Sequence, residues 1–492
     1  MALPTALYSA SQVRSLDAHA IQHLGVPGYT LMKRAGEAAL RFLRSRWPMS
    51  HRIVIVCGGG NNGGDGYVLA RFAQAAGLTV TVLAAKPVES LRGDALQAYN
   101  DFVASDGRAQ AFDPGLLLAG EVIVDALFGT GLNKPVQDED AKVIAAINES
   151  SRAVFALDVP SGLNADTGNE MGDAVYADCT VTFVGLKTGL YIGDGPEHTG
   201  TVYFDDLGVE APATAEYAPC LERIVETEIL RALPRRPRAA HKGDFGRVVI
   251  IGSGVGMPGA VRMSGEACLR VGAGLVTVAV APENIAAIAS GRPELICLGL
   301  EDETMLQQAL EKANVVAIGP GLGKNEWSRM ALSVALDCGK PLVVDADALN
   351  LIAERKERPR DNWILTPHPG EAGRMLGVSS DDIQKDRITA LEQLVDRYGG
   401  TIVLKGAGTL VGGKGRIPGL CERGNPGMAS PGTGDVLTGA IAGVLAQAGD
   451  PWLSTRAAVL IHAMAGDAVA RGGERGLLAS DVARELRTFV NL

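Results

Sequence analysis

The stretch RIVIVCGGGNNGGDGYVLARFAQAAG, residues 52–77, decides the fold of the first half of this 492-residue chain. A short apolar run leads directly into a cluster of glycines, and an alanine-rich segment with helical spacing follows. An apolar run that ends in glycine before a helix is typical of a buried parallel strand. The stretch therefore predicts a strand, a glycine loop and a helix from about Tyr67, the unit of a doubly wound α/β sheet.

The alternation continues on both sides of this unit. Residues 10–47 carry apolar side chains at helical spacing, which predicts helix. Three further apolar runs, LTVTVLA, EVIVDALFGTG and AVFALDVPSG, follow before residue 163. The Pro- and charge-rich segment 233–243, with the Pro- and Ala-rich segment before it, indicates a domain boundary near residues 210–240.

Beyond this boundary the strand pattern starts again. Most of its six strand-like runs end in Gly or a polar residue, namely RVVIIGSG, GLVTVAVA, NVVAIGPGLG, PLVVDADALN, WILTPHPGEA and TIVLKGAGTL. They predict a second doubly wound sheet, in which ligands bind beyond the carboxyl ends of the strands. We therefore predict an α/β protein with two α/β/α domains, residues 1–215 and 225–492.

Composition and charge narrow the possible functions. The net charge of −10 argues against nucleic-acid binding, which needs a basic surface. The seven Cys are dispersed without a C-x-x-C pair, and the seven His are scattered, so neither a disulfide framework nor a zinc site is indicated. We find no signal peptide and no run of 18 apolar residues, so we expect a cytoplasmic protein without a membrane partner.

The first glycine loop, residues 58–66, matches G-x-G-x-x-G and by itself suggests a dinucleotide-binding dehydrogenase. However, the next strand ends in Ala84, Ala85 and Lys86, where such a site needs an acid for the ribose. A plain strand-to-helix turn is the alternative, but it does not explain two Asn and an Asp among six Gly.

Two later strands of this half also end in oxygen-bearing side chains. Asp125 ends one strand, and Asp158 and Ser161 follow the next. Each Asp alone is more often a cap or turn former. If the topology is as predicted, Asn62, Asp125 and Ser161 could form an oxygen pocket for a hard cation.

A second glycine turn, PGTGDVLTG at residues 431–439, runs directly into an apolar helix. The first N–H groups of that helix point at the turn and would stabilise an anion there. Asp435 lies beside this anion site, where a simple helix-cap role is the alternative. No G-x-x-x-x-G-K-[ST] motif is present, so a P-loop NTPase is excluded.

The motifs GGGNNGGDG, DALFGTGL and DVPSGLNADTG resemble the epimerase module of the NAD(P)H-hydrate repair enzymes. Its substrate is NAD(P)H with an added water at C6 of the nicotinamide ring, and its fold is Rossmann-like. The resemblance implies that Asp158 is the acid–base residue and that K⁺ is held by Asn62, Asp125 and Ser161. It assigns substrate binding to Asp158 and to two loops: Asn61, Asn62, Gly63, Gly64, Asp65, Gly129, Thr130, Gly131, Leu132, Asn133, Lys134 and Pro135.

The second half resembles the ADP- or ATP-dependent dehydratase of the same family, which has a ribokinase-like fold. KGDFGRVVIIGSG, GPGLG, LTPHPGE, KGAGT and PGTGD carry this resemblance. It implies that Asp435 is the base toward the hydrate's hydroxyl, with Mg²⁺ at the phosphoryl group. It assigns hydrate binding to Ala260, Gly321, Gly323, His368 and Asp435, and nucleotide binding to Lys405, Gly406, Ala407, Gly408, Thr409 and Gly434.

The resemblance covers nearly the whole chain and predicts a bifunctional repair enzyme, an isomerase fused to a lyase. The first domain would interconvert the R and S epimers of NADHX and NADPHX. The second would dehydrate the S form, with ADP as phosphoryl donor because fused members resemble the ADP-using type, and with AMP and phosphate as products. A homo-oligomer is expected from the family. The alternatives are a hydroxymethylpyrimidine- or thiazole-type kinase for the second domain and a dinucleotide- or RNA-binding module for the first.

Overall fold

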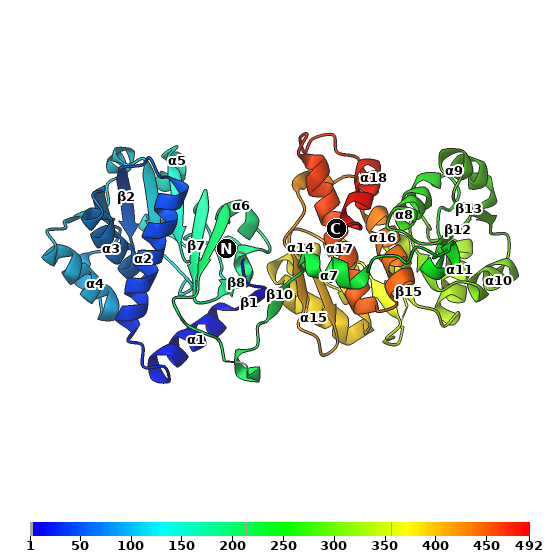
Figure 1. Ribbon diagram of the computed structural model, residues 1–492, viewed down its shortest axis with the longest axis horizontal. Coiled ribbons are helices and arrows are strands. Elements are labelled where there is room, and N and C mark those ends of the chain that lie inside the picture. The colour runs from blue at the N-terminus through cyan, green and yellow to red at the C-terminus, as the bar shows by residue number, and fades with distance from the viewer. Residues whose placement is uncertain (1–2, 213, 356) are drawn as a thin grey trace. The chain divides into compact units, whose positions relative to one another are not determined.

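The computed structural model describes residues 3–212, 214–355 and 357–492. The chain divides into two compact units on either side of the Leu221–Glu222 bond (Figure 1). Each unit is built around a largely parallel sheet, so the predicted α/β class is confirmed. The functional domain bounds, 1–215 and 225–492, stay a prediction.

The first unit contains a seven-stranded, fully parallel sheet with the order β4-β3-β2-β5-β6-β7-β9. β2 lies inside the sheet and leads into the first glycine loop, as predicted. The strands are β2 (Arg52–Cys57), β3 (Thr79–Ala84), β4 (Ala109–Ala111), β5 (Val122–Ala126), β6 (Ala153–Leu157), β7 (Cys179–Phe183) and β9 (Thr201–Asp205). Outside this seven-stranded sheet, β1 (Ala6–Tyr8) pairs in parallel with β8 (Leu186–Lys187).

Helices cover both faces of this sheet because alternate residues of each strand point to opposite sides. Ile53 and Ile55 of β2 pack in a core with helices α1 (Ala10–Gln22), α2 (Gly28–Arg46), α3 (Asn61–Ala75) and α4 (Gly93–Ala104). Val54 and Val56 pack instead with α5 (Asp138–Glu149). A five-residue helix, α6 (Gly195–Thr199), precedes β9.

Two predicted helix bounds in this unit were wrong. Residues 10–47 form two helices, because Gly25 adopts a φ of +67° and Pro27 is the N-cap of α2. α3 begins at Asn61 and not near Tyr67, with extended Gly60 as its N-cap. The sequence NNGGDG is therefore helical, and its glycines let the first turn lie against the preceding loop: a Cβ on Gly63 would lie 2.1 Å from the Gly58 carbonyl oxygen.

In the second unit the sheet order is β13-β12-β11-β14-β15-β16-β17-β18-β19, with β10 (Leu221–Arg223) beside β19. All six predicted runs form parallel strands, while β18 and β19 add antiparallel pairs. The strands are β11 (Arg247–Ile251), β12 (Leu275–Val280), β13 (Ile296–Gly299), β14 (Val315–Ile318), β15 (Leu342–Val344), β16 (Trp363–Leu365), β17 (Thr401–Leu404), β18 (Thr409–Gly413) and β19 (Gly419–Cys421).

The core of the second unit centres on the alanine- and glycine-rich helix α16 (Thr433–Ala448), which packs against α8 (Pro258–Arg270) and α17 (Pro451–Ala470). A Cβ on Gly439 would lie 1.9 Å from the Ser264 carbonyl oxygen, so α16 and α8 touch along their backbones. The other helices are α7 (Glu226–Ala232), α9 (Ile285–Gly291), α10 (Glu303–Glu311), α11 (Glu326–Asp337), α12 (Ala346–Ala353), α13 (Pro369–Leu376), α14 (Ser380–Lys385), α15 (Arg387–Tyr398) and α18 (Ala479–Phe489). Within the described ranges, no helix is long and apolar enough to cross a membrane.

Candidate active sites

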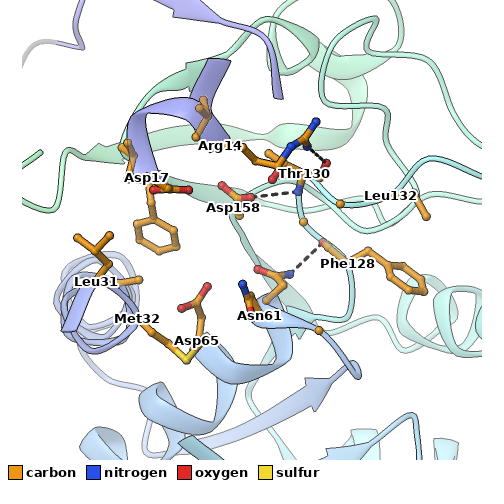
Figure 2. A pocket seen from close by; sticks show the side chains of 18 of the residues that line it. Arg14, Asp17, Leu31, Met32, Asn61, Asp65, Phe128, Thr130, Leu132 and Asp158 are labelled. Atoms are coloured by element: carbon orange, nitrogen blue, oxygen red, sulfur yellow. Dashed lines mark hydrogen bonds between the residues drawn. The ribbon is translucent and has the colours of Figure 1, made fainter. Parts of the chain in front are cut away.

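A cavity of about 660 Å³ opens beyond the carboxyl ends of β2, β5 and β6, as expected for a parallel sheet. Figure 2 shows its carboxylates and polar loop residues turned toward the same space. Of the predicted substrate-binding residues, the cavity is lined by Asn61, Asn62, Asp65, Gly129, Thr130, Gly131, Leu132, Asn133, Lys134 and Asp158. Gly63, Gly64 and Pro135 are not among its lining residues.

Asp158 follows β6 and is held in place by several contacts. Its Oδ1 lies 2.5 Å from the Lys187 Nζ, and its Oδ2 accepts a hydrogen bond from the Thr130 N–H at 3.2 Å. Its φ of +66° is in the left-handed region, which is costly for a residue with a Cβ. Backbone strain at a residue that lines a cavity indicates that the position of its side chain matters more than the stability lost to the strain.

Lys187 was not predicted as a site residue from the sequence. Its side chain is only 1% exposed, and its Nζ also donates to the Thr182 hydroxyl at 2.9 Å and the Phe183 carbonyl at 2.7 Å. A buried ammonium needs such partners, because an unpaired charge is expensive to bury. Lys187 thus fixes the Asp158 carboxylate through an ion pair.

Two further carboxylates in the cavity contrast with Asp158. Asp17 of α1 and Asp65 of α3 both line it, and no hydrogen bond or ion pair is found for either side chain among the described residues. Burial raises the pKa of Asp17 to about 6; the nearby Lys187 opposes that rise and Asp158 adds to it. Burial, with the charges of Asp158 and Asp17, raises the pKa of Asp65 well above its usual range. Asp17 was not predicted from the sequence.

The three predicted cation ligands lie beside this cavity. The Ser161 hydroxyl donates to Asp125 Oδ1 at 2.6 Å, and the Ser161 N–H donates to Asp125 Oδ2 at 2.8 Å. The Asn62 amide donates to the Phe128 carbonyl at 2.9 Å, but its buried Oδ1 has no hydrogen-bond partner. Burial raises the pKa of Asp125 to about 6. An orphaned amide oxygen near a buried carboxylate is a donor set that fits a cation with oxygen ligands.

The second site lies at the N-terminus of α16. Gly432 is the N-cap, with a φ of +93°, so Asp435 stands in the first turn and not at the cap position. Burial raises the pKa of Asp435 to about 7; the charges of Asp345 and Asp347 add to the rise and that of Lys405 opposes it. No side-chain hydrogen bond is found for Asp435 among the described residues. Its carboxylate is therefore free to accept a proton from a ligand on the turn.

Asp345, after β15, organises the surroundings of this turn and was missed in the sequence. It is buried, and its Oδ1 accepts from the Lys405 Nζ at 2.8 Å and the Thr366 hydroxyl at 2.8 Å. Its Oδ2 accepts from the Thr438 hydroxyl of α16 at 2.7 Å. Burial alone would lower the pKa of Lys405, but the charges of Asp345 and Glu371 raise it. Lys405 remains an ammonium that faces carboxylates.

A buried arginine binds the backbone of the predicted nucleotide loop. The Arg387 guanidinium donates to the carbonyls of Leu404, Lys405 and Gly408, each at 3.3 Å. Burial lowers the pKa of Arg387 to about 10. This arginine ties the backbone of residues 404–408 to α15, so the loop after β17 has a fixed path.

The predicted hydrate contacts come from different strand ends. A Cβ on Gly321 would lie 3.0 Å from the Ala260 Cβ, and the Gly323 N–H donates to the Asp347 carboxylate at 2.9 Å. His368 is the N-cap of α13, and its Nδ1 accepts from the Gly370 N–H at 3.0 Å. Burial lowers the pKa of His368. The His368 imidazole therefore caps α13. Its ring is half-exposed, and its Nε2 lies 3.5 Å from the Glu371 Oε1.

Comparison with known proteins matches both halves. A family model described as YjeF-related protein N-terminus matches residues 28–189, and one described as NAD(P)H-hydrate dehydratase matches residues 248–488. A bifunctional NAD(P)H-hydrate repair enzyme of Coxiella burnetii is 47% identical over 490 residues, 99% of this chain and 100% of that protein. The Escherichia coli protein of the same description is 42% identical over 493 residues, 100% of this chain and 95% of that protein.

The chain belongs to the family of bifunctional NAD(P)H-hydrate repair enzymes. Among solved structures, a ribokinase-like superfamily protein of Enterococcus faecalis is similar, with a TM-score of 0.51 and 33% identity over 55% of this chain and 95% of that one. Both predicted glycine elements lead into a helix, and the first turn of α16 carries the acidic residue Asp435.

Proposed function

We propose that the first unit epimerises the R and S forms of NAD(P)H-hydrate at C6 and that the second dehydrates the S form to NAD(P)H. Family membership over the full chain supports the pair of activities. The single observation that carries the assignment to two sites is the pair of carboxylates in separate units: Asp158 lines one cavity with the first residues of α3, and Asp435 lies in the first turn of α16.

For the first unit, we assign proton transfer to Asp158. The C6 carbon carries a hydroxyl beside the ring nitrogen, so inverting it requires a group that gives and takes protons. The backbone N–H groups at the start of α3 and the loop after β5 would hold the anionic parts of the dinucleotide. The Thr130 N–H already binds Asp158, so this loop positions both the carboxylate and the substrate.

We assign a potassium site to Asn62, Asp125 and Ser161, with the Phe128 carbonyl beside them. The unpartnered Asn62 Oδ1 and the buried Asp125 carboxylate support this assignment. A bound K⁺ would supply positive charge near the substrate-binding loop. The side chains would fix the path of residues 125–130, because Ser161 and Asn62 already bind the Phe128 backbone.

For the second unit, we assign Asp435 as the base that accepts the proton of the C6 hydroxyl. The hydroxyl then attacks the nucleotide phosphoryl group, while the N–H groups at Gly432–Gly434 stabilise its charge. The ring nitrogen lone pair expels phosphate from C6 and forms a C6=N bond. Loss of a proton from C5 to solvent then restores the C5=C6 double bond of NAD(P)H. A base with a pKa near the working pH suits this step.

We propose ADP as the phosphoryl donor, with AMP and phosphate as products, and binding by Lys405–Thr409 and Gly434. Mg²⁺ would neutralise phosphate charge; the described residues show no cluster of three acidic, His or Cys ligands, which fits an ion carried mainly by the nucleotide phosphates. Ala260, Gly321, Gly323 and His368 would contact the hydrate. All seven Cys are free thiols, which agrees with action in the cytoplasm. Assembly as a homo-oligomer stays a prediction.

The test is incubation of the purified protein with NADHX and ADP. We expect absorbance at 340 nm to return, with one AMP formed per NADH, and R-NADHX to reach equilibrium with S-NADHX faster than it does spontaneously. A stable phosphorylated product without recovery of absorbance would make the second unit a kinase. Epimer exchange at the spontaneous rate, with ligand still bound, would make the first unit a binding module.

A further inference from the structure

We propose that Asp17 is a second proton-transfer residue of the epimerase site and acts as a pair with Asp158. This inference rests on the proposed epimerase activity of the first unit. It is carried by the geometry of the cavity, to which α1, α3 and the end of β6 each contribute one carboxylate (Figure 2), while a fourth, Asp94 of α4, also lines it.

Helix α1 is positioned to present Asp17 to the cavity. Val13, Leu16 and Ala20 bury one face of the helix, and Asp17 stands at the border of that face, where it lines the cavity. The Arg14 guanidinium donates to the Thr130 carbonyl at 3.1 Å, which joins α1 to the predicted substrate loop. Asp17 is thus held beside the substrate-binding cavity, while its carboxylate makes no hydrogen bond or ion pair with the described residues.

The reaction needs two proton-transfer groups. C6 bears a hydroxyl and a ring nitrogen, as the reacting carbon of a sugar bears two oxygens, and enzymes invert such carbons with one carboxylic acid and one carboxylate. Protonated Asp17 gives its proton to the C6 hydroxyl, and the C6–O bond breaks as the nitrogen lone pair forms a C6=N bond. Water then attacks the other face of C6 and yields its proton to Asp158. Each turnover thus loses one water and gains one, and solvent carries the proton from Asp158 back to Asp17. In the reverse reaction Asp158 acts as the acid and Asp17 as the base.

The environments of Asp17, Asp65 and Asp158 give these carboxylates different roles. Asp158 is ion-paired with Lys187 of β8. This ion pair suits Asp158 as the base in the direction in which Asp17 acts as the acid. Asp17 faces Asp65 of α3, Asp158 and Lys187, with Arg14 on its own helix, and its pKa near 6 lets it exchange a proton close to neutral pH. Burial and the charges of Asp158 and Asp17 raise the pKa of Asp65 well above its usual range, which favours its neutral form as a hydrogen-bonding partner of the substrate.

The experiment measures exchange of R- and S-NADHX by the full-length protein and its Asp17→Asn variant from pH 5 to 8, corrected for the spontaneous rate. We expect the variant to lower kcat about 100-fold or more, since general acid–base groups contribute about 10²–10⁴-fold. KM should stay within about threefold, because Asn keeps the size and polarity of Asp. The wild-type rate should fall as pH rises through the pKa of Asp17, and this limb should be absent in the variant.

Two further variants make the test specific. Asp17→Glu keeps a carboxyl group and should exchange epimers at least tenfold faster than Asp17→Asn. Glu37→Gln, an exposed carboxylate on α2, should match the wild type. An active wild type with Asp17→Asn at the same kcat, or equal rates for the Asn and Glu variants, would overturn the role of Asp17. A wild type no faster than the spontaneous exchange would instead overturn the epimerase function itself.

Discussion

The two sites hold their predicted acid–base carboxylates in different ways. Asp158 is fixed by a buried ammonium 2.5 Å away and adopts a left-handed backbone conformation. Asp435 sits in the first turn of α16, and burial raises its pKa to about 7. The first site thus fixes the position of its carboxylate with an ion pair, whereas burial raises the pKa of the carboxylate in the second site, so the two sites should respond differently to mutation.

The largest effect is expected at Asp435. Asp435→Asn removes the only carboxylate in the first turn of α16, and we expect dehydration to slow about 10³-fold, within the range for a general base. Recovery of absorbance at 340 nm from S-NADHX and ADP measures it. Epimer exchange should keep its wild-type rate, since Asp158 lies in the other unit. Loss of both activities would contradict two independent sites.

Lys187→Met should damage only the first site. It leaves the Asp158 carboxylate without its ion-pair partner, so we expect about 100-fold slower epimer exchange and about 3 kcal/mol lower stability of the first unit. Exchange kinetics and thermal unfolding measure the two effects. Lys142→Met is the matched control, because Lys142 is 72% exposed and pairs with Glu139 on the surface, where a pair contributes at most about 1 kcal/mol. Equal effects of the two variants would refute a role for the buried pair.

The pH dependence of the two activities should have opposite signs. Asp435 must be ionised to accept a proton, so dehydration should fall about tenfold between pH 8 and pH 6, through its pKa of about 7. Epimer exchange needs protonated Asp17 and should fall as pH rises through about 6. Initial rates across this range decide the point. If the rates of dehydration and epimer exchange changed with pH in the same direction, the proposed roles of Asp435 and Asp17 would be contradicted.

Cation exchange should give the smallest effect and act on one site only. Replacing K⁺ by a bulky organic cation should slow epimer exchange several-fold, because Asn62 and Asp125 then lose a shared partner and the Phe128 loop loosens. Dehydration should be unchanged when Mg²⁺ is kept constant. An epimerase rate that does not depend on K⁺ would remove the proposed cation site.

The sequence predicts most strands and both glycine elements, because apolar runs and glycine clusters are local signals. The sequence does not predict site residues whose role depends on residues that are distant in the chain. Asp17 looks like an ordinary polar position of an amphipathic helix until the fold sets it in the cavity. Lys187 follows β7, which was not predicted as a strand because the buried Thr180 and Thr182 interrupt its apolar pattern. Only the folded sheet brings Lys187 to Asp158. Asp345 was hidden for the same reason, since its partners come from three separate elements.

The most direct test of two sites serving one substrate is recovery of NADH from an R/S mixture of NADHX with ADP. We predict that the wild type restores all the absorbance at 340 nm. Asp158→Asn should restore only the S fraction quickly and the rest at the spontaneous epimerisation rate, and Asp435→Asn should restore both fractions about 10³-fold more slowly than the wild type. Full recovery at the wild-type rate by either variant would contradict this account.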